Sequence, residues 1–308
     1  MIFWGCFNSC WGYWYLNGTV QEAIFHNVSS LSELLSIELM WSRRCYLAMG
    51  LLLCTLLTAC AAPIEDRRPE PLNALTQAGF DTVALNPPIR AWVRESSVET
   101  APWHLYLEGD GNAWLRGGVP SPNPTPRSPV ALWLALEDTS TRVAYIGRPC
   151  QWFTSLPDSC QPAIWTDERY GEQAQQWLLE TIQTIAGDQP IRLIGFSGGA
   201  HLALQLAPLL PEIEGVVSVA GNLDDKLFAE HHRLPAPRHV PKGIMEVPLW
   251  SLSGGADRTV PPELTERMLK AREGRCQSHL VLERVEHAGP WQLNWSRIQD
   301  FLEDCASG

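Results

Sequence analysis

The fold is decided by the stretch Ile191-Arg192-Leu193-Ile194-Gly195-Phe196-Ser197-Gly198-Gly199-Ala200-His201-Leu202-Ala203-Leu204. Its short apolar run predicts a buried strand, its Gly-x-Ser-x-Gly pattern predicts a sharp turn, and residues 200–210 predict a helix. A serine at such a turn has a strained backbone, so small neighbours such as Gly195 and Gly199 are needed beside it. The positive end of the following helix points at Ser197 and favours negative charge there. The pattern indicates an exposed nucleophile; the alternative is an ordinary glycine-rich turn that matches by chance.

Apolar strands alternate with helix-like segments on both sides of this stretch. The predicted strands cover residues 89–95, 103–107, 143–147, 191–194, 215–219, 248–252 and 280–285. The predicted helices cover residues 129–138, 172–186, 200–210, 262–272 and 290–304. This alternation is typical of α/β proteins with a mostly parallel central sheet and helices on both faces. Ligands of such sheets bind at the carboxyl ends of the strands, where Ser197 is expected.

The composition is that of a folded protein that does not bind nucleic acid. The 308 residues are 45% hydrophobic and 19% charged, which is ordinary for a chain that buries a large core. The formal net charge of −11 argues against a nucleic-acid partner, because phosphate-binding surfaces need clustered Lys and Arg. The sequence has no internal repeat, no Cys/His cluster with metal-ligand spacing and no phosphate-binding glycine loop. We therefore expect no metal and no organic cofactor, and nothing in the sequence indicates the oligomeric state.

A secretory signal is predicted near the N-terminus. The basic segment Met40-Trp41-Ser42-Arg43-Arg44 precedes an apolar run over residues 45–58, and small residues follow it. The end of this run, Leu57-Thr58-Ala59-Cys60, resembles the lipobox of bacterial lipoproteins, in which the cysteine is lipidated and becomes the mature N-terminus. A transmembrane anchor is the alternative, because the uncharged run over residues 45–64 reaches 20 residues, about the minimum for spanning.

These features divide the chain into four predicted parts. They are a mis-assigned N-terminal extension (residues 1–39), a lipoprotein signal peptide (40–59), a charged and proline-containing tether (60–80) and a folded domain (81–308). Ala61 lacks the acidic character that commonly retains lipoproteins at the inner membrane. The resemblance therefore implies a bacterial envelope protein, anchored to the outer membrane by lipid on Cys60 and facing the periplasm.

The chain resembles the α/β-hydrolase family over residues 81–308. In that family the serine of the turn is followed along the chain by an acid and then by a histidine. Residues 251–261, Ser-Leu-Ser-Gly-Gly-Ala-Asp-Arg-Thr-Val-Pro, look like the strand end that carries the acid. Residues 285–290, Val-Glu-His-Ala-Gly-Pro, look like the histidine loop. The resemblance implies a catalytic triad of Ser197, Asp257 and His287.

Other residues compete for the roles of acid and base. Asp224 follows the preceding strand and is the rival acid, because some members of the fold carry it there, and Asp257 could be a turn residue. The rival histidines are His201 in the helix after the turn, and His231, His232 and His239 between two strands. His287 directly follows the last strand, so we favour it as the base.

The resemblance also implies an oxyanion hole made of two backbone N–H groups. One belongs to Gly198, and the other comes from the loop Leu107-Glu108-Gly109-Asp110-Gly111. Many family members have His-Gly-x-Gly here, whereas this chain has Glu108 in place of the histidine. By position Asp110 is expected to supply the second N–H group; an ordinary Asp-Gly turn is the alternative.

The implied activity is hydrolysis of a small-molecule ester or related acyl bond through an acyl-enzyme on Ser197, without a cofactor. A serine peptidase is one alternative, and an envelope lipoprotein that uses the fold as a binding or scaffold module is another. Trp114, Trp152 and Trp165 are candidates for an apolar acyl pocket, with buried packing as the other interpretation.

Four cysteines follow Cys60 in the chain, and an even number in an oxidising compartment favours pairing. Cys150 and Cys160 flank a short loop, so we predict a disulfide between them. Cys276 and Cys305 are then left, and their pairing is an open possibility.

Overall fold

The structure is a computed structural model that describes residues 69–96, 101–234, 247–272 and 276–307. The predicted signal, Cys60 and His239 lie outside the described residues. The helices are α4 (Pro69–Gln77), α5 (Val130–Glu137), η2 (Pro162–Trp165), α6 (Glu172–Ala186), α7 (Gly198–Leu206), η3 (Ala207–Leu209), α8 (Asp225–His232), α9 (Pro262–Arg272) and α10 (Trp295–Ser307). The strands are β1 (Asp81–Thr82), β2 (Ala91–Glu95), β3 (Trp103–Leu107), β4 (Trp114–Leu115), β5 (Val119–Pro120), β6 (Arg142–Ile146), β7 (Ile191–Phe196), β8 (Ile213–Val219), β9 (Leu249–Gly254) and β10 (Gln277–Leu282).

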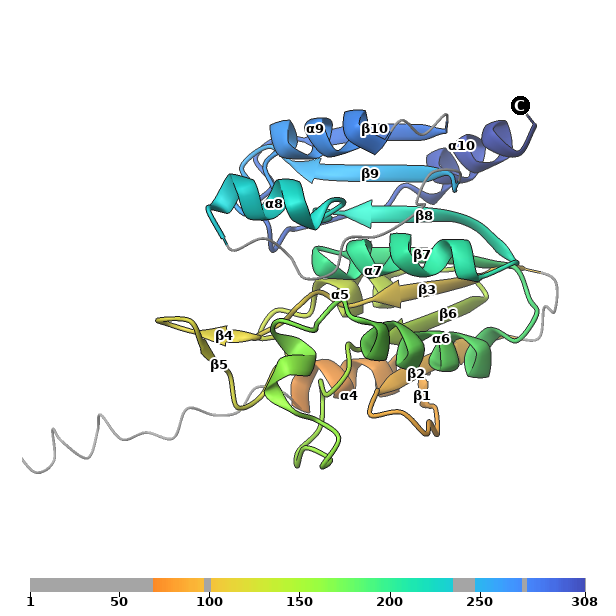
Figure 1. Cartoon of the computed structure of the whole chain (residues 1–308). Coiled ribbons are helices and arrows are strands. Elements are labelled where there is room, and N and C mark those ends of the chain that lie inside the picture. The colour runs from red at the N-terminus through yellow and green to blue at the C-terminus, as the bar shows by residue number, and fades with distance from the viewer. Residues whose placement is uncertain (1–68, 97–100, 235–246, 273–275, 308) are drawn as a thin grey trace, which may run out of the picture. The chain divides into compact units, whose positions relative to one another are not determined.

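Eight of the described strands form one sheet in the order β1-β2-β6-β3-β7-β8-β9-β10 (Figure 1). β2 pairs antiparallel with β1 and with β6, and every other neighbouring pair is parallel. The arrowheads of β3, β8 and β9 accordingly point to the same side in Figure 1. This side, called the carboxyl edge below, is where parallel strands present their ends together.

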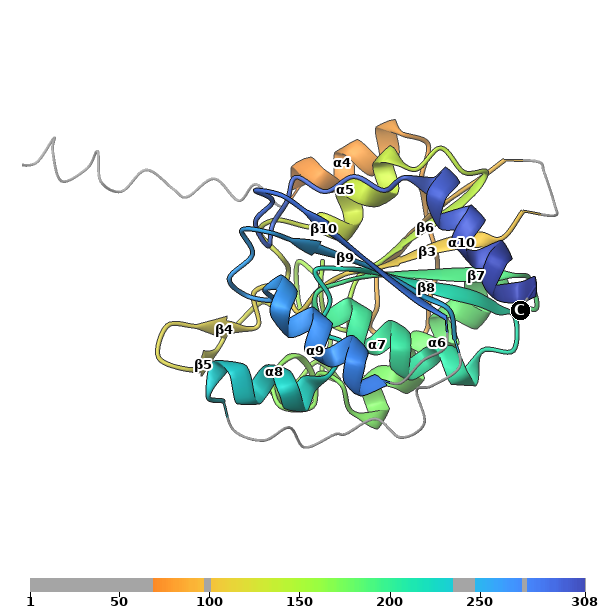
Figure 2. The ribbon, with the colours of Figure 1, turned by 90° about the horizontal axis from the view of Figure 1, so that it is seen from above.

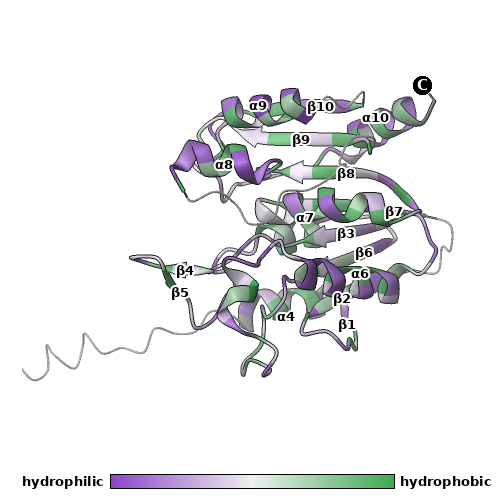
Figure 3. Cartoon of the chain, in the orientation of Figure 1, coloured by the Kyte–Doolittle hydropathy of each residue, from purple (hydrophilic) through white to green (hydrophobic). Residues whose placement is uncertain are grey.

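Helices cover both faces of the sheet. Figure 2 shows α4, α5 and α10 on one face and α6, α7, α8 and α9 on the other. Neighbouring strand residues point to opposite faces: in β7, Leu193 packs in the cluster that contains the α6 and α7 side chains, and Ile194 packs in the cluster with α5 and α10. A strand buried on both faces must be apolar throughout, which explains the continuous run in the sequence. Hydrophilic residues gather on the helices α6 and α8 instead (Figure 3).

The predicted fold class is confirmed. Each predicted strand and helix has a counterpart in the structure, with ends that differ by a few residues. The sequence did not indicate the short pair β4–β5 or the helix α8. Both lie in loops at the carboxyl edge, where a run of seven or eight residues carries no periodic pattern of its own.

The start of the domain differs from the prediction. The helix α4 lies inside the stretch 60–80 that we interpreted as a tether, and Leu75 within it is fully buried against α5 and the sheet. The prolines Pro69 and Pro71 suggested a solvated linker, but proline is also well tolerated in the first turn of a helix. The folded domain therefore begins before Asp81.

Both possible disulfides are present in the structure. Cys150 pairs with Cys160, with their Cα atoms 5.7 Å apart, and Cys276 pairs with Cys305, with Cα atoms 5.8 Å apart. The first closes the loop that carries Trp152. The second joins the segment just before β10 to α10.

Candidate active site

Ser197 lies on the turn between β7 and α7. Its φ and ψ angles are 51° and −119°, so it adopts a positive φ that only glycine reaches without strain. Two backbone hydrogen bonds hold this conformation: the Ser197 N–H donates to the Val219 carbonyl at 3.0 Å, and the Asn222 N–H donates to the Ser197 carbonyl at 3.1 Å. The strained turn is thus fixed to the end of the neighbouring strand β8.

The two glycines of the turn leave no room for a side chain. A Cβ atom at Gly195 would collide with the backbone of Ala200, and one at Gly199 would collide with the carbonyl oxygens of Leu107 and Glu108. The second contact brings the start of α7 directly against the loop after β3. The Gly-x-Ser-x-Gly pattern therefore reflects close backbone packing.

His287 and Asp257 complete a chain of hydrogen bonds that begins at Ser197. The His287 Nε2 atom is 3.1 Å from Ser197 Oγ, and its Nδ1 atom is 2.8 Å from Asp257 Oδ2. A carboxylate can only accept, so Nδ1 carries the proton and Nε2 is left as the acceptor facing Ser197. The other Asp257 oxygen accepts the N–H groups of Thr259 and Val260 at 2.7 and 2.9 Å. The carboxylate is buried and fixed, whereas the imidazole is about one-quarter exposed.

The rival acid Asp224 and the rival histidines His201 and His232 are engaged elsewhere. Asp224 caps α8, where its Oδ1 atom accepts the Leu227 N–H at 3.0 Å. His232 donates from Nε2 to the Thr259 carbonyl at 2.7 Å. His201 is buried against the Tyr170 ring, and burial lowers the pKa of His201 to about 4, so it is neutral. Within the described part of the chain, His287 is the histidine that reaches Ser197.

The two predicted oxyanion-hole residues are also brought together. Gly198 is the first residue of α7, and the N–H of such a residue has no acceptor within its own helix. The Asp110 carboxylate lies against Gly198, where a Cβ atom on the glycine would collide with Asp110 Oδ1. Asp110 follows β3, so two neighbouring strand ends place both residues beside Ser197.

Known proteins were compared with the chain by sequence and by structure. No protein-family model matches the sequence, and no curated protein matches it. A membrane phospholipase A shares 17% identity at a TM-score of 0.52, over 85% of this chain and all of that one. A Xanthomonas campestris serine hydrolase without a lid shares 16% identity at a TM-score of 0.46, over 74% and 94% of the two chains. Est1E from Butyrivibrio proteoclasticus shares 12% identity at a TM-score of 0.47, over 75% and 100%.

The chain has the α/β-hydrolase fold. Ser197 follows β7, which is the fifth strand of the main sheet along the chain. Asp257 follows the seventh strand, β9, and His287 follows the eighth, β10. Two helix layers and six parallel strands therefore present all three residues at the carboxyl edge.

In this α/β-hydrolase fold the Asp110 carboxylate is held by groups that the sequence did not indicate. Arg148 Nη1 donates to Oδ1 at 2.9 Å, Arg169 Nε donates to Oδ2 at 3.1 Å, and the Tyr170 hydroxyl donates to both oxygens at 3.1–3.2 Å. Burial by itself raises the pKa of Asp110, but the positive charges of Arg169 and Arg148 outweigh it and lower the pKa below its usual value. Asp225 lies 3.4 Å from Arg169 as a second carboxylate. We call Asp110, Arg148, Arg169, Tyr170 and Asp225 the arginine cluster.

Glu108, in the loop after β3, is a buried carboxyl group. It accepts the Gly109 N–H at 2.9 Å and the Tyr145 hydroxyl at 3.1 Å, and that hydroxyl accepts Trp152 Nε1 at 2.8 Å. Burial raises the pKa of Glu108 to about 7, because these hydrogen bonds compensate only part of the lost hydration. The side chain anchors the loop that leads to Asp110.

A cavity of about 440 Å³ opens beside Ser197, a size that suits a small organic ligand. Its lining comes from the loop after β3, the segment that leads into α5, the end of β7 with the turn, α8, the loop after β9 and the histidine loop: Glu108, Asp110, Gly111, Asn112, Pro126, Arg127, Ser128, Val130, Phe196, Ser197, Phe228, Thr259, His287 and Ala288. None of the three tryptophans proposed for an acyl pocket is among them. Trp152 and Trp165 are buried in packing, and Trp114 is exposed on β4.

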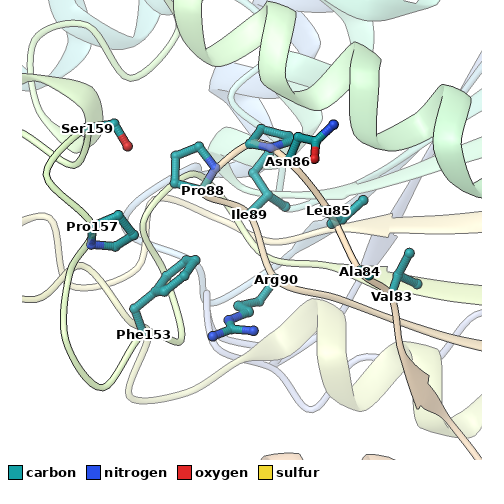
Figure 4. Close-up of a pocket in the computed structure, with 11 residues that line it drawn as sticks. Val83, Ala84, Leu85, Asn86, Pro88, Ile89, Arg90, Phe153, Pro157 and Ser159 are labelled. Atoms are coloured by element: carbon teal, nitrogen blue, oxygen red, sulfur yellow. The ribbon is translucent and has the colours of Figure 1, made fainter.

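A second cavity, of about 370 Å³, lies between residues 83–90 and the loop closed by Cys150 and Cys160 (Figure 4). Its one charged lining residue is Arg90, whose guanidinium stacks on the Phe153 ring at 4.5 Å. No nucleophile and base are paired there. The cavity beside Ser197, called the triad cavity below, is therefore the candidate site. Across the described residues there is no group of His, Cys, Asp and Glu side chains suited to a metal ion. No helix in the described ranges is long and apolar enough to cross a membrane.

Proposed function

We propose that the protein is a serine hydrolase that cleaves a carboxylic ester or a related acyl bond through an acyl-enzyme on Ser197. The observation that carries this proposal is the hydrogen-bonded series Ser197 Oγ, His287 Nε2, His287 Nδ1 and Asp257 Oδ2, with spacings of 3.1 and 2.8 Å. A serine hydroxyl is a weak nucleophile at neutral pH, and this series supplies the base and the carboxylate that orients it.

In the first half-reaction, Ser197 Oγ attacks the acyl carbon while His287 Nε2 takes the hydroxyl proton. Asp257 stabilises the resulting imidazolium and keeps its ring orientation. The negative charge that develops on the acyl oxygen is stabilised by the N–H groups of Gly198 and Asp110. His287 then gives its proton to the departing alcohol, which leaves the acyl group on Ser197.

In the second half-reaction, water replaces the alcohol. His287 takes a proton from the water as its oxygen attacks the acyl-enzyme, and then returns that proton to Ser197 Oγ as the carboxylic acid leaves. The partial exposure of His287 supports this step, because the attacking water must reach its Nε2 atom.

We propose further that the mature protein begins at a lipidated Cys60 and faces the periplasm from the outer membrane. The basic segment, the apolar run and the sequence Leu57-Thr58-Ala59-Cys60 support this location. Mass spectrometry of the N-terminal peptide tests it. We expect a diacylated or triacylated Cys60; a peptide that contains Trp4 or Trp11, or an unmodified Cys60, would contradict it.

Labelling with a fluorophosphonate probe tests the hydrolase itself. We expect stoichiometric labelling of the purified protein and no labelling of Ser197→Ala. Asp224→Asn is the matched control, because Asp224 caps α8 and is not bonded to the histidine. Absence of labelling in a correctly folded protein would favour the binding or scaffold module.

A further inference from the structure

The pair β4–β5 forms a hairpin whose residues are all exposed. Residues 114–120, Trp-Leu-Arg-Gly-Gly-Val-Pro, make a run of seven exposed positions between the buried residues Ala113 and Ser121. Trp114, Leu115 and Val119 are 42%, 41% and 55% exposed. Single exposed apolar side chains are common, but three on one seven-residue hairpin need an explanation.

The hairpin is held firmly at its base. The Ser121 N–H donates to the Ala113 carbonyl at 2.9 Å, Asn112 Nδ2 donates to Ser121 Oγ at 2.9 Å, and Trp165 Nε1 donates to the Ser121 carbonyl at 3.1 Å. At the tip, Gly117 and Gly118 have φ angles of 81° and 73°, which allow the tight turn. The apolar side chains are thus presented on a fixed support.

The hairpin lies beside the mouth of the triad cavity. Gly111 and Asn112, which line that cavity, immediately precede it in the chain. Both Figure 1 and Figure 2 show β4 and β5 projecting on the side of the carboxyl edge, the side on which α8 also lies. The hairpin and the cavity beside Ser197 therefore lie at the same edge of the sheet.

The composition of the hairpin suits a lipid surface. Tryptophan favours the boundary between headgroups and acyl chains, and leucine and valine favour the apolar side of it. The one charged residue is Arg116, which suits anionic headgroups, although the chain as a whole carries a net charge of −11. The start of the described chain at α4 also lies only nine positions after Cys60, the predicted lipidation site, a span of at most about 32 Å when extended.

We propose that the β4–β5 hairpin docks the protein on a phospholipid surface and so presents the triad cavity to acyl esters of that surface. The proposal rests on the proposed hydrolase function for its consequence, but the docking itself requires no catalysis. It assigns Trp114, Leu115 and Val119 as the inserted side chains and Arg116 as the contact to anionic headgroups.

Vesicle flotation tests the docking. The mature form, residues 60–308 with Cys60→Ser and Ser197→Ala, has no lipid, no turnover and no apolar run of residues 45–58, and it is mixed with vesicles of phosphatidylcholine and phosphatidylglycerol. We expect the triple change Trp114→Ser, Leu115→Ser and Val119→Ser to weaken vesicle binding at least about tenfold, because burial of each apolar side chain contributes to the affinity. The matched control is Trp133→Ser on α5, where the tryptophan is 43% exposed; its binding should change less than about twofold.

Three results would overturn the proposal: vesicle binding that the triple change leaves intact, an equal loss in the Trp133→Ser control, and no vesicle binding by the parent chain. A change in the size-exclusion elution of the triple variant, with vesicle binding unchanged, would assign the hairpin to a second copy of the chain instead. Thermal unfolding midpoints check that the variants fold. Fluorophosphonate labelling of the same hairpin variants on an intact Ser197 separates a failure of docking from a failure of the hydrolase function.

Discussion

On one side of Ser197 a partly exposed imidazole is held by one buried carboxylate; on the other side, two arginines and a tyrosine hold the carboxylate of Asp110. In the proposed reaction, the first side exchanges protons with substrate and water, so His287 needs access and one firm partner. The second side would keep the proposed oxyanion-hole N–H groups still while charge develops beside them. An imidazole with one carboxylate partner and a carboxylate with three donor partners therefore stand next to the same serine.

The charges of the two sides also differ. Asp257 is stabilised by two backbone N–H groups and its histidine. The arginine cluster instead contains two carboxylates and two guanidinium groups, so its formal charges cancel. Because these charges are only partly exposed, removing one partner would leave the charges of the others uncompensated.

The largest effect is expected on the histidine side. Asp257→Asn should lower kcat by about 10⁴-fold with little change in folding, because the amide favours the wrong imidazole tautomer and does not stabilise the imidazolium. Steady-state kinetics on an activated short-chain ester measures it.

Asp224→Asn is the control for this prediction and should cost far less, since Asp224 only caps a helix. If Asp224→Asn lost kcat instead of Asp257→Asn, the assignment of the acid would be wrong, and the assignments of Ser197 and His287 would be unaffected.

The pH dependence of the free energy of unfolding tests the burial of Glu108, which anchors the loop that leads to Asp110. Because its pKa is about 7 in the folded protein, against 4.5 for an exposed glutamate, the folded state holds this proton more tightly than the unfolded chain does. Its contribution to stability is therefore complete below pH 4.5 and is lost as the pH rises towards 7, by about 3 kcal/mol. Urea unfolding across this window should show that loss in the parent and not in Glu108→Gln. Equal pH dependence in both proteins would contradict the burial of an ionisable carboxyl group.

Arg148 tests whether the arginine cluster positions the oxyanion hole. Arg148→Met should lower kcat by about 10²-fold with KM little changed, because a small displacement of the Asp110 N–H weakens binding of the transition state more than that of the substrate.

The matched control is Arg192→Met, which removes a comparable ion pair, 2.8 Å to Glu214, at the opposite end of the strands. If both variants lost stability equally and neither lost kcat, Arg148 would serve only the fold.

The smallest effect is expected for the disulfide between Cys150 and Cys160. Cys150→Ser with Cys160→Ser should lower the free energy of unfolding by roughly 2–3 kcal/mol, because the short loop regains freedom in the unfolded chain. The loop carries Trp152, which bonds to Tyr145 and through it to Glu108. We therefore expect a measurable fall in kcat as well. Urea unfolding and ester kinetics on one preparation give both values. An unchanged kcat would show that the loop does not support the position of Glu108 and Asp110.

The sequence predicted the histidine side better than the arginine side for a physical reason. Ser197, Asp257 and His287 each follow a strand and stand among small or turn-forming neighbours, so each has a local pattern in a known order. Arg148, Arg169 and Tyr170 lie in irregular loops, and only the folded chain brings them to Asp110 from 38 to 60 positions away. The replacement at Glu108 was visible, but its partners Tyr145 and Trp152 were not. Likewise α4 was missed because its prolines suggested a linker.

The second disulfide has a consequence for how the site is assembled. Cys276 and Cys305, 29 positions apart, close a covalent ring that contains His287, whereas Ser197 and Asp257 lie outside it. Reduction would leave Ser197 and Asp257 after their strands. It would break the covalent link between the two ends of the segment that carries His287. In the proposed hydrolase, the base therefore lies on the part of the chain that this disulfide closes. Formation of this bond would then fix both ends of the segment that carries His287.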